Sequence, residues 1–380
     1  MKEGWKKVKL MDNCSVTTGK NDANHAVDNG RYRFYTCASE YLYCNTYKYD
    51  GACIILPGNG ANVGDVYFYE GKFDAYQRTY VIDNISPKVL PFYLYYQLQY
   101  GWKTYGVAKQ YGSATNYIKI GNFKDYEFLC PNIDTQKEIV EYLDSSFAKI
   151  DKLKENAAKN LEEAKALFQS ALKDALEPKE GWEEKRFEEF VVSNVVGLTR
   201  GKIEQGYNKM YPYFKMNNIS NKNTLCWDDL IYVDADSDEV KKYTLQEGDF
   251  LFNTRNSKEW VGKSTVYRNA THKIMLYNNN IMRIRFLPII NSVFMCYSFS
   301  ADFVKDQLEK IKKGTTNVWA IYYRELSQIK IKYPPLSEQQ EIVSRLDSLN
   351  EKVNTLQQNY SRICSECDAL KQSILRQVFE

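Results

Sequence analysis

Two loops in the sequence resemble binding sites for a phosphate or a metal ion, and each lacks a residue that the chemistry needs. Residues 257–264 end as Gly-Lys-Ser, like a loop that cradles phosphates, but Ser257 stands where such a loop opens with glycine. Residues 234–238 open with alternating aspartates, like a calcium loop. There, Glu239 replaces the glycine of the turn and Leu245 replaces the carboxylate of the twelfth position. We expect neither a nucleotide site nor a metal site.

The other reactive side chains are too scattered for catalysis or zinc binding. Cys364 and Cys367 have the spacing of a metal-ligand pair, but no second pair or nearby histidine completes a set of four ligands. The two histidines, His25 and His272, are far apart in the sequence. The Asn/Asp-Pro-Pro-aromatic string of an amino-methyltransferase does not occur. We therefore predict a chain with no catalytic residues and no bound metal or cofactor.

The composition is that of an ordinary soluble protein with more than one domain. The 380 residues, 44% hydrophobic and 26% charged, are enough for two or three domains with their own cores. No run of about 18 apolar residues could cross a bilayer, and residues 1–10 lack the apolar stretch of a secretory signal. Nine cysteines, an odd number, argue against a disulfide framework. These features predict a cytoplasmic protein with reduced thiols and no membrane contact.

The small net charge of +3 hides an uneven distribution along the chain. Residues 1–130 carry 15 Lys and Arg against 12 Asp and Glu, and residues 181–333 carry 23 against 18. Residues 131–180 carry 8 against 11, and residues 334–380 carry 5 against 7. If the chain binds nucleic acid, the two basic pieces should contact it.

An internal repeat with an offset of 203 residues organises the chain. Pro131–Val140 recurs as Pro334–Val343, and both segments end in Glu-Ile-Val. Looser matches pair Gly112–Asn116 with Gly314–Asn317, Gly4-Trp5 with Gly181-Trp182, Gly19-Lys20 with Gly201-Lys202, Tyr32–Tyr35 with Tyr211–Phe214, and Gly51 with Gly248. The repeat predicts four parts: a globular unit at 1–130, a long helix at 131–180, a second globular unit at 181–333 and a second long helix at 334–380.

Apolar residues step by four and three through both helical segments, which predicts a coiled coil. In the second segment the seam comprises Ile342, Leu346, Leu349, Val353, Leu356, Tyr360, Ile363, Cys367, Leu370 and Ile374. In the first it comprises Leu143, Ile150, Leu153 and Leu167, with small partners at Ala157, Ala164 and Ala171. Asp134 and Ser337 are the expected N-caps of helices of roughly 43 residues. Each apolar stripe needs a partner, so we expect an antiparallel pair.

The globular units are predicted to be strand-rich. The expected strands are 52–56, 63–69 and 78–82 in the first unit, and 250–253, 264–267 and 281–286 in the second. Short helices are expected at 88–100 and 293–311. The predicted fold class is α+β: two globular domains separated by two long antiparallel coiled-coil helices, related by a pseudo-two-fold internal repeat.

With this order of elements, the chain resembles the DNA specificity subunits of type I restriction-modification systems over essentially its whole length. The resemblance is carried by the helix openings at 131–143 and 334–346, by Trp5 and Trp182, and by residues 248–263. It implies that each globular unit is a target-recognition domain for one half of a split DNA site, with the helices setting the distance between halves.

The same resemblance implies partners and cofactors. The partners would be double-stranded DNA, two methyltransferase subunits held by the helices, and restriction subunits in the full complex. S-adenosylmethionine, ATP and Mg²⁺ would be used by those subunits and not bound by this chain. Two departures from the family pattern are Trp260, where a smaller apolar residue is more familiar, and Pro57–Gly60, which replaces the Asn253–Asn256 string. The two units should therefore read different half-sites.

Two predicted loops combine cations with amides, the side chains that read base edges and phosphates. Arg255 could read guanine and Asn256 adenine in the major groove, while Lys263 would suit a phosphate. The complete set of predicted DNA-binding residues is Lys20, Asn59, Asn62, Tyr76, Arg78, Lys202, Arg255, Asn256, Lys258 and Lys263.

Two other functions stay open at this point. One is a stand-alone DNA-cleaving enzyme that clamps its substrate between paired domains, with Asp234 and Glu239–Lys241 as a faint carboxylate set. The other is a coiled-coil scaffold that binds only protein. Turnover of DNA by the chain alone would favour the first.

Overall fold

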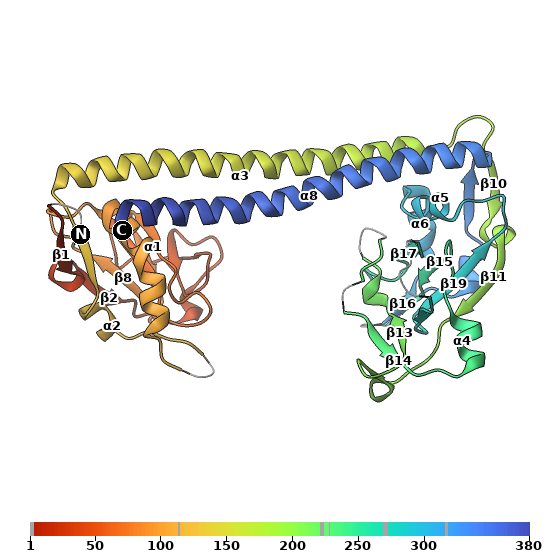
Figure 1. Ribbon diagram of the computed structural model, residues 1–380, viewed down its shortest axis with the longest axis horizontal. Coiled ribbons are helices and arrows are strands. Elements are labelled where there is room, and N and C mark those ends of the chain that lie inside the picture. The colour runs from red at the N-terminus through yellow and green to blue at the C-terminus, as the bar shows by residue number, and fades with distance from the viewer. Residues whose placement is uncertain (1–3, 113–114, 221–223, 228, 269–272, 316–317) are drawn as a thin grey trace. The chain divides into compact units, whose positions relative to one another are not determined.

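The computed structural model describes residues 4–112, 115–220, 224–227, 229–268, 273–315 and 318–380. The chain divides into two compact units, Met1–Lys159 with Gln358–Glu380, and Asn160–Gln357. Each unit contains one globular domain and a stretch of each of two long helices (Figure 1). The predicted fold class, α+β domains with long helices in a repeated arrangement, is confirmed.

The two long helices, α3 (Ile133–Leu176) and α8 (Leu336–Phe379), have 44 residues each. In the first unit Lys154 forms an ion pair with Asp368 at 2.9 Å, and Lys371 forms one with Asp151 at 2.6 Å. Residue numbers therefore rise along one helix as they fall along the other, which makes this stretch antiparallel. In the second unit Leu172 of α3 and Leu346 of α8 belong to the same core.

Both predicted N-caps are wrong by two residues. Because the helices begin at Ile133 and Leu336, Asp134 and Ser337 lie inside the first turn. Asn132 occupies the capping position of α3, where its Oδ1 accepts a hydrogen bond from the backbone N–H of Thr135 at 2.9 Å.

The predicted apolar seam is only partly right. The buried members are Leu143, Ile150, Ile342, Leu346, Val353 and Cys367. Leu153, Leu167 and Leu370 are instead 58%, 71% and 48% exposed. The heptad pattern assumes that each helix packs only on the other, whereas Phe147 and Phe379 pack into the core of the first domain.

A buried glutamine fastens α3 to the first domain. The Nε2 of Gln136 donates to the carbonyl oxygens of Lys88 and Pro131, both at 2.9 Å, and its Oε1 accepts from the backbone N–H of Leu90 at 2.9 Å. The side chain is fully buried. It therefore ties the loop before α3 to the segment before α1 (Pro91–Ala108).

Gln339, the repeat counterpart, fastens α8 to the second domain. Its Nε2 donates to the carbonyl oxygens of Ile289 (3.1 Å) and Pro334 (2.9 Å), and its Oε1 accepts from the backbone N–H of Asn291 (2.8 Å). This side chain is also fully buried. The repeated helix opening thus encodes one attachment that is used twice.

The first domain contains two small sheets and a terminal strand pair. The main sheet is antiparallel, in the order β2 (Ser15–Thr18), β8 (Thr79–Asp83), β5 (Ala52–Pro57) and β6 (Tyr67–Glu70). The second has the order β4 (Leu42–Cys44), β3 (Tyr32–Tyr35) and β7 (Phe73–Ala75). β1 (Lys6–Lys9) pairs with β9 (Glu127–Cys130), just before α3. The helix α1 packs on β5 and β6, and α2 (Gly121–Lys124) follows it.

The second domain repeats this plan with insertions. Its main sheet has the order β11 (Val191–Val196), β19 (Ile281–Phe286), β15 (Phe250–Asn253) and β17 (Ser264–Val266). A second sheet has the order β12 (Gln205–Gly206), β14 (Ile231–Val233), β13 (Tyr211–Phe214) and β18 (Leu276–Tyr277). A third has the order β16 (Arg255–Asn256), β21 (Trp319–Ala320) and β20 (Lys313–Gly314), and β10 (Glu183–Arg186) pairs with β22 (Lys330–Tyr333). The short helices are α4 (Ser237–Tyr243), α5 (Ser292–Ser298), α6 (Asp302–Ile311) and α7 (Tyr323–Leu326).

Most predicted strands are found, and two helix predictions are corrected. The strands at 250–253 and 281–286 have the predicted bounds, whereas the strand expected at 63–69 begins only at Tyr67. The helix expected at 88–100 runs from Pro91 to Ala108. The helix expected at 293–311 is two helices, because the chain turns at 299–301 between α5 and α6.

The repeat also has a different register in the main sheet from the one predicted. β8 and β19 hold the same place in the two main sheets, and Ile54 pairs with Ile82 of β8 as Phe250 pairs with Ile284 of β19. Ile54 therefore corresponds to Phe250, and the match of Gly51 with Gly248 is one residue out. A one-residue slip moves every side chain to the other face of a strand.

The counterpart of Gly19 is Gly197, and not Gly201. A Cβ on Gly19 would lie 1.7 Å from the carbonyl oxygen of Ala75, and one on Gly197 would lie 2.3 Å from that of Tyr277. Only glycine fits at either place. Lys20 and Lys202 are therefore not equivalent.

We predict that Gln339→Leu lowers the free energy of unfolding of the second domain by about 2 to 5 kcal/mol, because three buried backbone groups lose their partner. Gln340→Leu, at the exposed neighbouring position, should change it by less than about 0.5 kcal/mol. Urea denaturation of the two variants measures the difference. Equal stability of both would contradict an attachment through Gln339.

Candidate nucleic-acid interface

A buried asparagine shapes the loop that follows β15 in the second domain. The Nδ2 of Asn253 donates to the carbonyl oxygens of Asn280 (2.9 Å) and Arg255 (3.1 Å). Its Oδ1 accepts from the Nδ2 of Asn256 at 3.0 Å. Asn253 is fully buried. These bonds fix the backbone of the loop at the point where Arg255 leaves it.

This loop is one strand of a small sheet. Arg255 pairs with Ala320 and Asn256 with Trp319, while Ala320 also pairs with Lys313 on its other side. Two segments far apart in the sequence, the loop after β15 and the Gly314 hairpin, therefore lie side by side. Residues 316–317 of that hairpin lie outside the described part of the chain.

Cations and aromatic rings stand on or beside this sheet. The ammonium of Lys258 lies 5.0 Å from the ring centroid of Trp319. Arg255 is exposed and has no ion pair within the described ranges of the chain. Trp260, two residues after Lys258, and Tyr322, three residues after Trp319, are also exposed. An exposed guanidinium on a sheet that also carries the Lys258–Trp319 pair is suited to contact bases and phosphates.

Two of the residues predicted here have hydrogen bonds within the domain. The Oδ1 of Asn256 accepts from the backbone N–H of Ser257 at 2.9 Å, in addition to the bond between its Nδ2 and Asn253. The ammonium of Lys263 donates to the carbonyl oxygen of Ile219 at 2.7 Å, and burial lowers the pKa of Lys263. The geometry thus assigns Asn256 and Lys263 to shaping the loop, and leaves Arg255 and Lys258 available for a ligand.

The first domain has an equivalent arrangement. Isolated bridges join Asn59 to Tyr117 and Tyr117 to Tyr111. In the second domain Arg255 pairs with Ala320, and Ala320 pairs with Lys313, in the same order. The backbone N–H of Gly58 donates to Arg78 (2.9 Å), and its carbonyl oxygen accepts from Ile118 (2.9 Å). In the second domain, the backbone N–H of Thr254 donates to the carbonyl oxygen of Asn280 (2.8 Å), and the carbonyl oxygen of Thr254 accepts from Ile321 (3.0 Å). Asn59 therefore occupies the place of Arg255.

All five residues predicted for the first domain belong to this one group of loops. Lys20 precedes Asn21, whose carbonyl oxygen accepts from Gln77 in the turn that carries Tyr76 and Arg78. Lys20 and Arg78 are exposed. The amide of Asn62 donates to the carbonyl oxygen of Cys37 at 2.8 Å, so it secures its own loop.

Sequence reasoning missed the aromatic part of this surface. Tyr111 and Tyr117 are exposed and stacked, with ring centroids 5.7 Å apart, and the ammonium of Lys119 lies 4.5 Å from the ring of Tyr111. The similarity of Gly112–Asn116 to Gly314–Asn317 was the available signal. It marks the hairpin, but residues 113–114 lie outside the described part of the chain, as do 316–317.

Lys202 does not join the Arg255 group through any bond of the described residues. It is exposed at the start of a short 3-10 turn, Lys202–Glu204, next to Arg200, which forms an ion pair with Glu239 at 2.5 Å. The loop at 234–238 is the N-terminal cap of α4, where the carboxylate of Asp236 accepts from the backbone N–H of Glu239.

The weak metal and catalytic signals lead to no cluster. Within the described ranges no three His, Cys, Asp or Glu side chains are grouped as they would be around a metal ion. Cys367 is buried, and its thiol faces the carbonyl oxygen of Ile150 at 4.0 Å. His25 is hydrogen-bonded to Thr46, and His272 lies outside the described residues.

Comparison with known proteins decides the family. The model of the type I restriction modification DNA specificity domain matches residues 2–163 and, again, residues 179–363. The chain belongs to this family. The two matches contain the two interface loops, so the repeat seen in the sequence is a repeat of the family's domain.

Curated specificity subunits of type I restriction enzymes align with much of the chain. The EcoDI specificity subunit from Escherichia coli is 27% identical over 409 residues, covering 99% of this chain and 88% of that protein. The EcoKI specificity subunit from Escherichia coli strain K12 is 24% identical over 281 residues, covering 70% and 60%. The putative MjaX specificity subunit from Methanocaldococcus jannaschii is 28% identical over 182 residues, covering 47% and 41%.

Solved structures of the family share the fold. A chain from a structure concerned with assembly and conformational transition of the type I R-M system has a TM-score of 0.74 at 16% identity, covering 100% of this chain and 98% of that chain. The HsdS subunit from Thermoanaerobacter tengcongensis has a TM-score of 0.54 at 16% identity, covering 100% and 97%. Among the residues that the structure describes, no helix is both long enough and apolar enough to cross a membrane.

We predict that Asn253→Ala loosens the loop that carries Arg255 and lowers the free energy of unfolding by about 1 to 3 kcal/mol, because the Asn256 amide and the Arg255 carbonyl lose buried partners. Hydrogen exchange of residues 255–262 should become faster. Asn217→Ala, at an exposed asparagine of the same domain, should change neither quantity. Unchanged exchange in Asn253→Ala would show that the loop is held in another way.

Proposed function

We propose that this chain is a non-catalytic subunit that recognises a two-part DNA sequence, one half with each domain, within a type I restriction-modification complex. The observation that carries the proposal is a ladder of paired residues that occurs in both domains: Asn59, Tyr117 and Tyr111 in the first, and Arg255, Ala320 and Lys313 in the second. In each ladder a loop and a hairpin present exposed cations and aromatic rings. DNA recognition needs cations for phosphates and forked donors or amides for base edges. Both ladders supply them.

The two ladders should read different bases. Arg255 in the second domain is replaced by Asn59 in the first. A guanidinium pairs best with the O6 and N7 of guanine, whereas an amide pairs best with the N6 and N7 of adenine. The first domain compensates with Arg78 and Lys119 on neighbouring loops.

Chemistry on the DNA is assigned to partner subunits in this proposal. They would use S-adenosylmethionine for methyl transfer, and ATP and Mg²⁺ for restriction. The carboxylates of the rival nuclease reading are engaged in ion pairs, Asp234 with Lys209 at 2.8 Å and Glu239 with Arg200. Cleavage of DNA by the purified chain with Mg²⁺ alone would favour the rival.

Exposed leucines on the long helices support a complex with two copies of one partner. Leu153 and Leu370 lie in the first unit, in the stretch that the Lys154–Asp368 and Lys371–Asp151 ion pairs hold together. Their repeat counterparts, Leu356 and Leu167, lie in the second unit and are also exposed. Exposed apolar side chains that recur in equivalent places are typical of interaction sites. We propose that each leucine pair contacts one methyltransferase subunit.

We predict that Arg255→Ala relaxes one half of the recognised sequence and Arg78→Ala the other. Arg255→Ala should reduce discrimination at a single base pair by about 1 to 3 kcal/mol, because a bidentate contact to one base is lost. Methylome sequencing of cells that express each variant with its modification subunit measures both effects. Wild-type chain should give one two-part motif.

Two outcomes would contradict the proposal. The first is the absence of any sequence-specific methylation with wild-type chain. The second is relaxation of both halves by either single substitution, which would mean that the domains do not read independently.

We predict that Leu153→Glu combined with Leu370→Glu reduces the number of bound methyltransferase subunits from two to one, because charge replaces one of two apolar patches. The control combines Asn156→Glu with Ser373→Glu, which add the same charge at exposed polar positions of the same stretch. Native mass spectrometry of the complex counts the copies. Two copies bound to the leucine variant would exclude this contact.

A further inference from the structure

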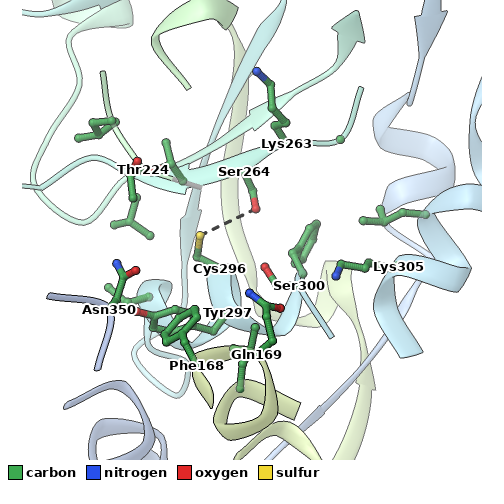
Figure 2. A pocket seen from close by; sticks show the side chains of 18 of the residues that line it. Phe168, Gln169, Thr224, Lys263, Ser264, Cys296, Tyr297, Ser300, Lys305 and Asn350 are labelled. Carbon is green, nitrogen blue, oxygen red and sulfur yellow. Dashed lines mark hydrogen bonds between the residues drawn. The ribbon is translucent and has the colours of Figure 1, made fainter. Parts of the chain in front are cut away.

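The second unit contains a cavity of about 810 Å³ between its globular domain and the long helices. Its apolar walls come from three helices and the residue that ends a fourth: Phe168 and Leu172 of α3, Leu308 of α6, Val353 of α8, and Phe299 just after α5. Cavities of about 300 to 1,000 Å³ with apolar walls and a few polar groups are typical of small-molecule sites. Figure 2 shows the side chains that line it.

The first unit has a smaller hollow, about 400 Å³, at the equivalent place. Its helix wall contains Phe147, whose ring packs edge-on against Tyr96 with centroids 5.5 Å apart and is covered by the Lys371 ammonium at 5.1 Å. The repeat offset of 203 places Asn350 at the position of Phe147 in the second unit. A phenyl ring that lines the first hollow is thus replaced by a short amide in the second, while Phe168 stands where the first unit has Lys371.

The two hollows also differ in charge. In the first, Lys103 forms an ion pair with Asp65 at 3.2 Å. In the second, Lys263 stands at the place of Asp65, because it follows the left-handed glycine Gly262 as Asp65 follows Gly64, and Lys305 of α6 also lines the cavity. A cation therefore replaces the carboxylate.

Lys305 and Lys263 differ from the other cations of the cavity, which form ion pairs. Lys305 has no ion pair in the ranges that the structure describes, and Lys263 donates to backbone carbonyls. Lys165, Arg268 and Lys312, which also line the cavity, form ion pairs with Glu162, Asp347 and Glu309. Lys305 is therefore the lining cation that a bound anion could pair with.

The polar groups converge on one side of the cavity. In Figure 2 the ammonium of Lys305 is directed toward Ser300, and the amide of Gln169 points to the same place. The ring of Phe168 lies below them, beside Tyr297. A ligand with its acid group at Lys305 would place its apolar part against the aromatic wall.

We propose that this cavity binds a small planar anion, an aromatic carboxylate or sulfonate, whose acid group pairs with Lys305 and whose ring packs against Phe168 and Phe299. The acid takes the place of the carboxylate that Asp65 supplies in the first unit, and the ring takes the place of Phe147. The cavity shares the loop at 259–263 with the second DNA-reading ladder, but the proposed contacts, Lys305, Phe168 and Phe299, lie outside that ladder.

The probe is anilinonaphthalene sulfonate, an aromatic sulfonate whose fluorescence rises in apolar surroundings. Titration of the full chain should show one saturable site. Asn350→Phe, which restores the ring found in the first unit, should weaken binding at that site at least tenfold. Lys305→Gln, at an exposed position that folding does not require, should weaken it several-fold and reduce its sensitivity to salt.

Two control variants carry the same changes outside the cavity. Asn354→Phe adds a ring one turn further along α8, and Lys310→Gln removes an exposed charge from α6. Both should bind the dye like the wild-type chain. The proposal is overturned if the dye does not bind, or if its affinity is unchanged in Lys305→Gln and Asn350→Phe, because the dye then binds elsewhere. If Asn350→Phe does not fold, Lys305→Gln alone decides.

Discussion

The architecture depends on one buried side chain used twice, the glutamine in the first turn of each long helix. An amide can donate and accept at once, so Gln136 and Gln339 each join three backbone groups of a loop that could not otherwise pair in a dry interior. About two helical turns further on, a second contact fixes the rotation of the helix. The hydroxyl of Tyr96 donates to Asp144, and that of Tyr297 donates to Asp347 at 2.7 Å. Burial, followed by the neighbouring carboxylate, raises the pKa of both tyrosines.

These attachments leave the rest of each domain free to diverge. The two domains keep the order of the main sheet and the ladder beside it, yet they differ in insertions, in the residue at the centre of the ladder and in the filling of the hollow under the helices. A polar attachment repeated at the helix start holds position, and loops far from it carry the variation. This separation lets the loops change while the attachment of the helices stays the same.

The sequence was sufficient for the order of elements and for the helices, because long periodic segments carry their own signal. It was insufficient where a residue's role depends on a partner far away in the chain. Leu153 and Leu370 satisfy the heptad pattern but are exposed, because Phe147 and Phe379 pack into a domain core that the pattern ignores. The match of Gly201 with Gly19 failed for the same reason, since the requirement for glycine comes from the carbonyl of Ala75.

The candidate interface shows the same limit on a smaller scale. Composition pointed to the loop at 255–263, but could not say that Asn256 and Lys263 use their donors inside the domain while Arg255 does not. Nor could it pair Asn59 with Tyr117, because that bridge joins segments nearly sixty residues apart.

The burial of Phe379 has a consequence for how the protein is made. Phe379 packs edge-on against Tyr93, with ring centroids 5.8 Å apart, and both belong to the core of the first unit. A ribosome adds roughly 5 to 20 residues per second, so about 15 to 60 seconds separate the synthesis of these two rings. The second unit uses only residues 160–357 and can close its core during that interval. The domain that leaves the ribosome first is therefore the last to complete its fold, and until then it exposes an apolar surface that a chaperone could hold.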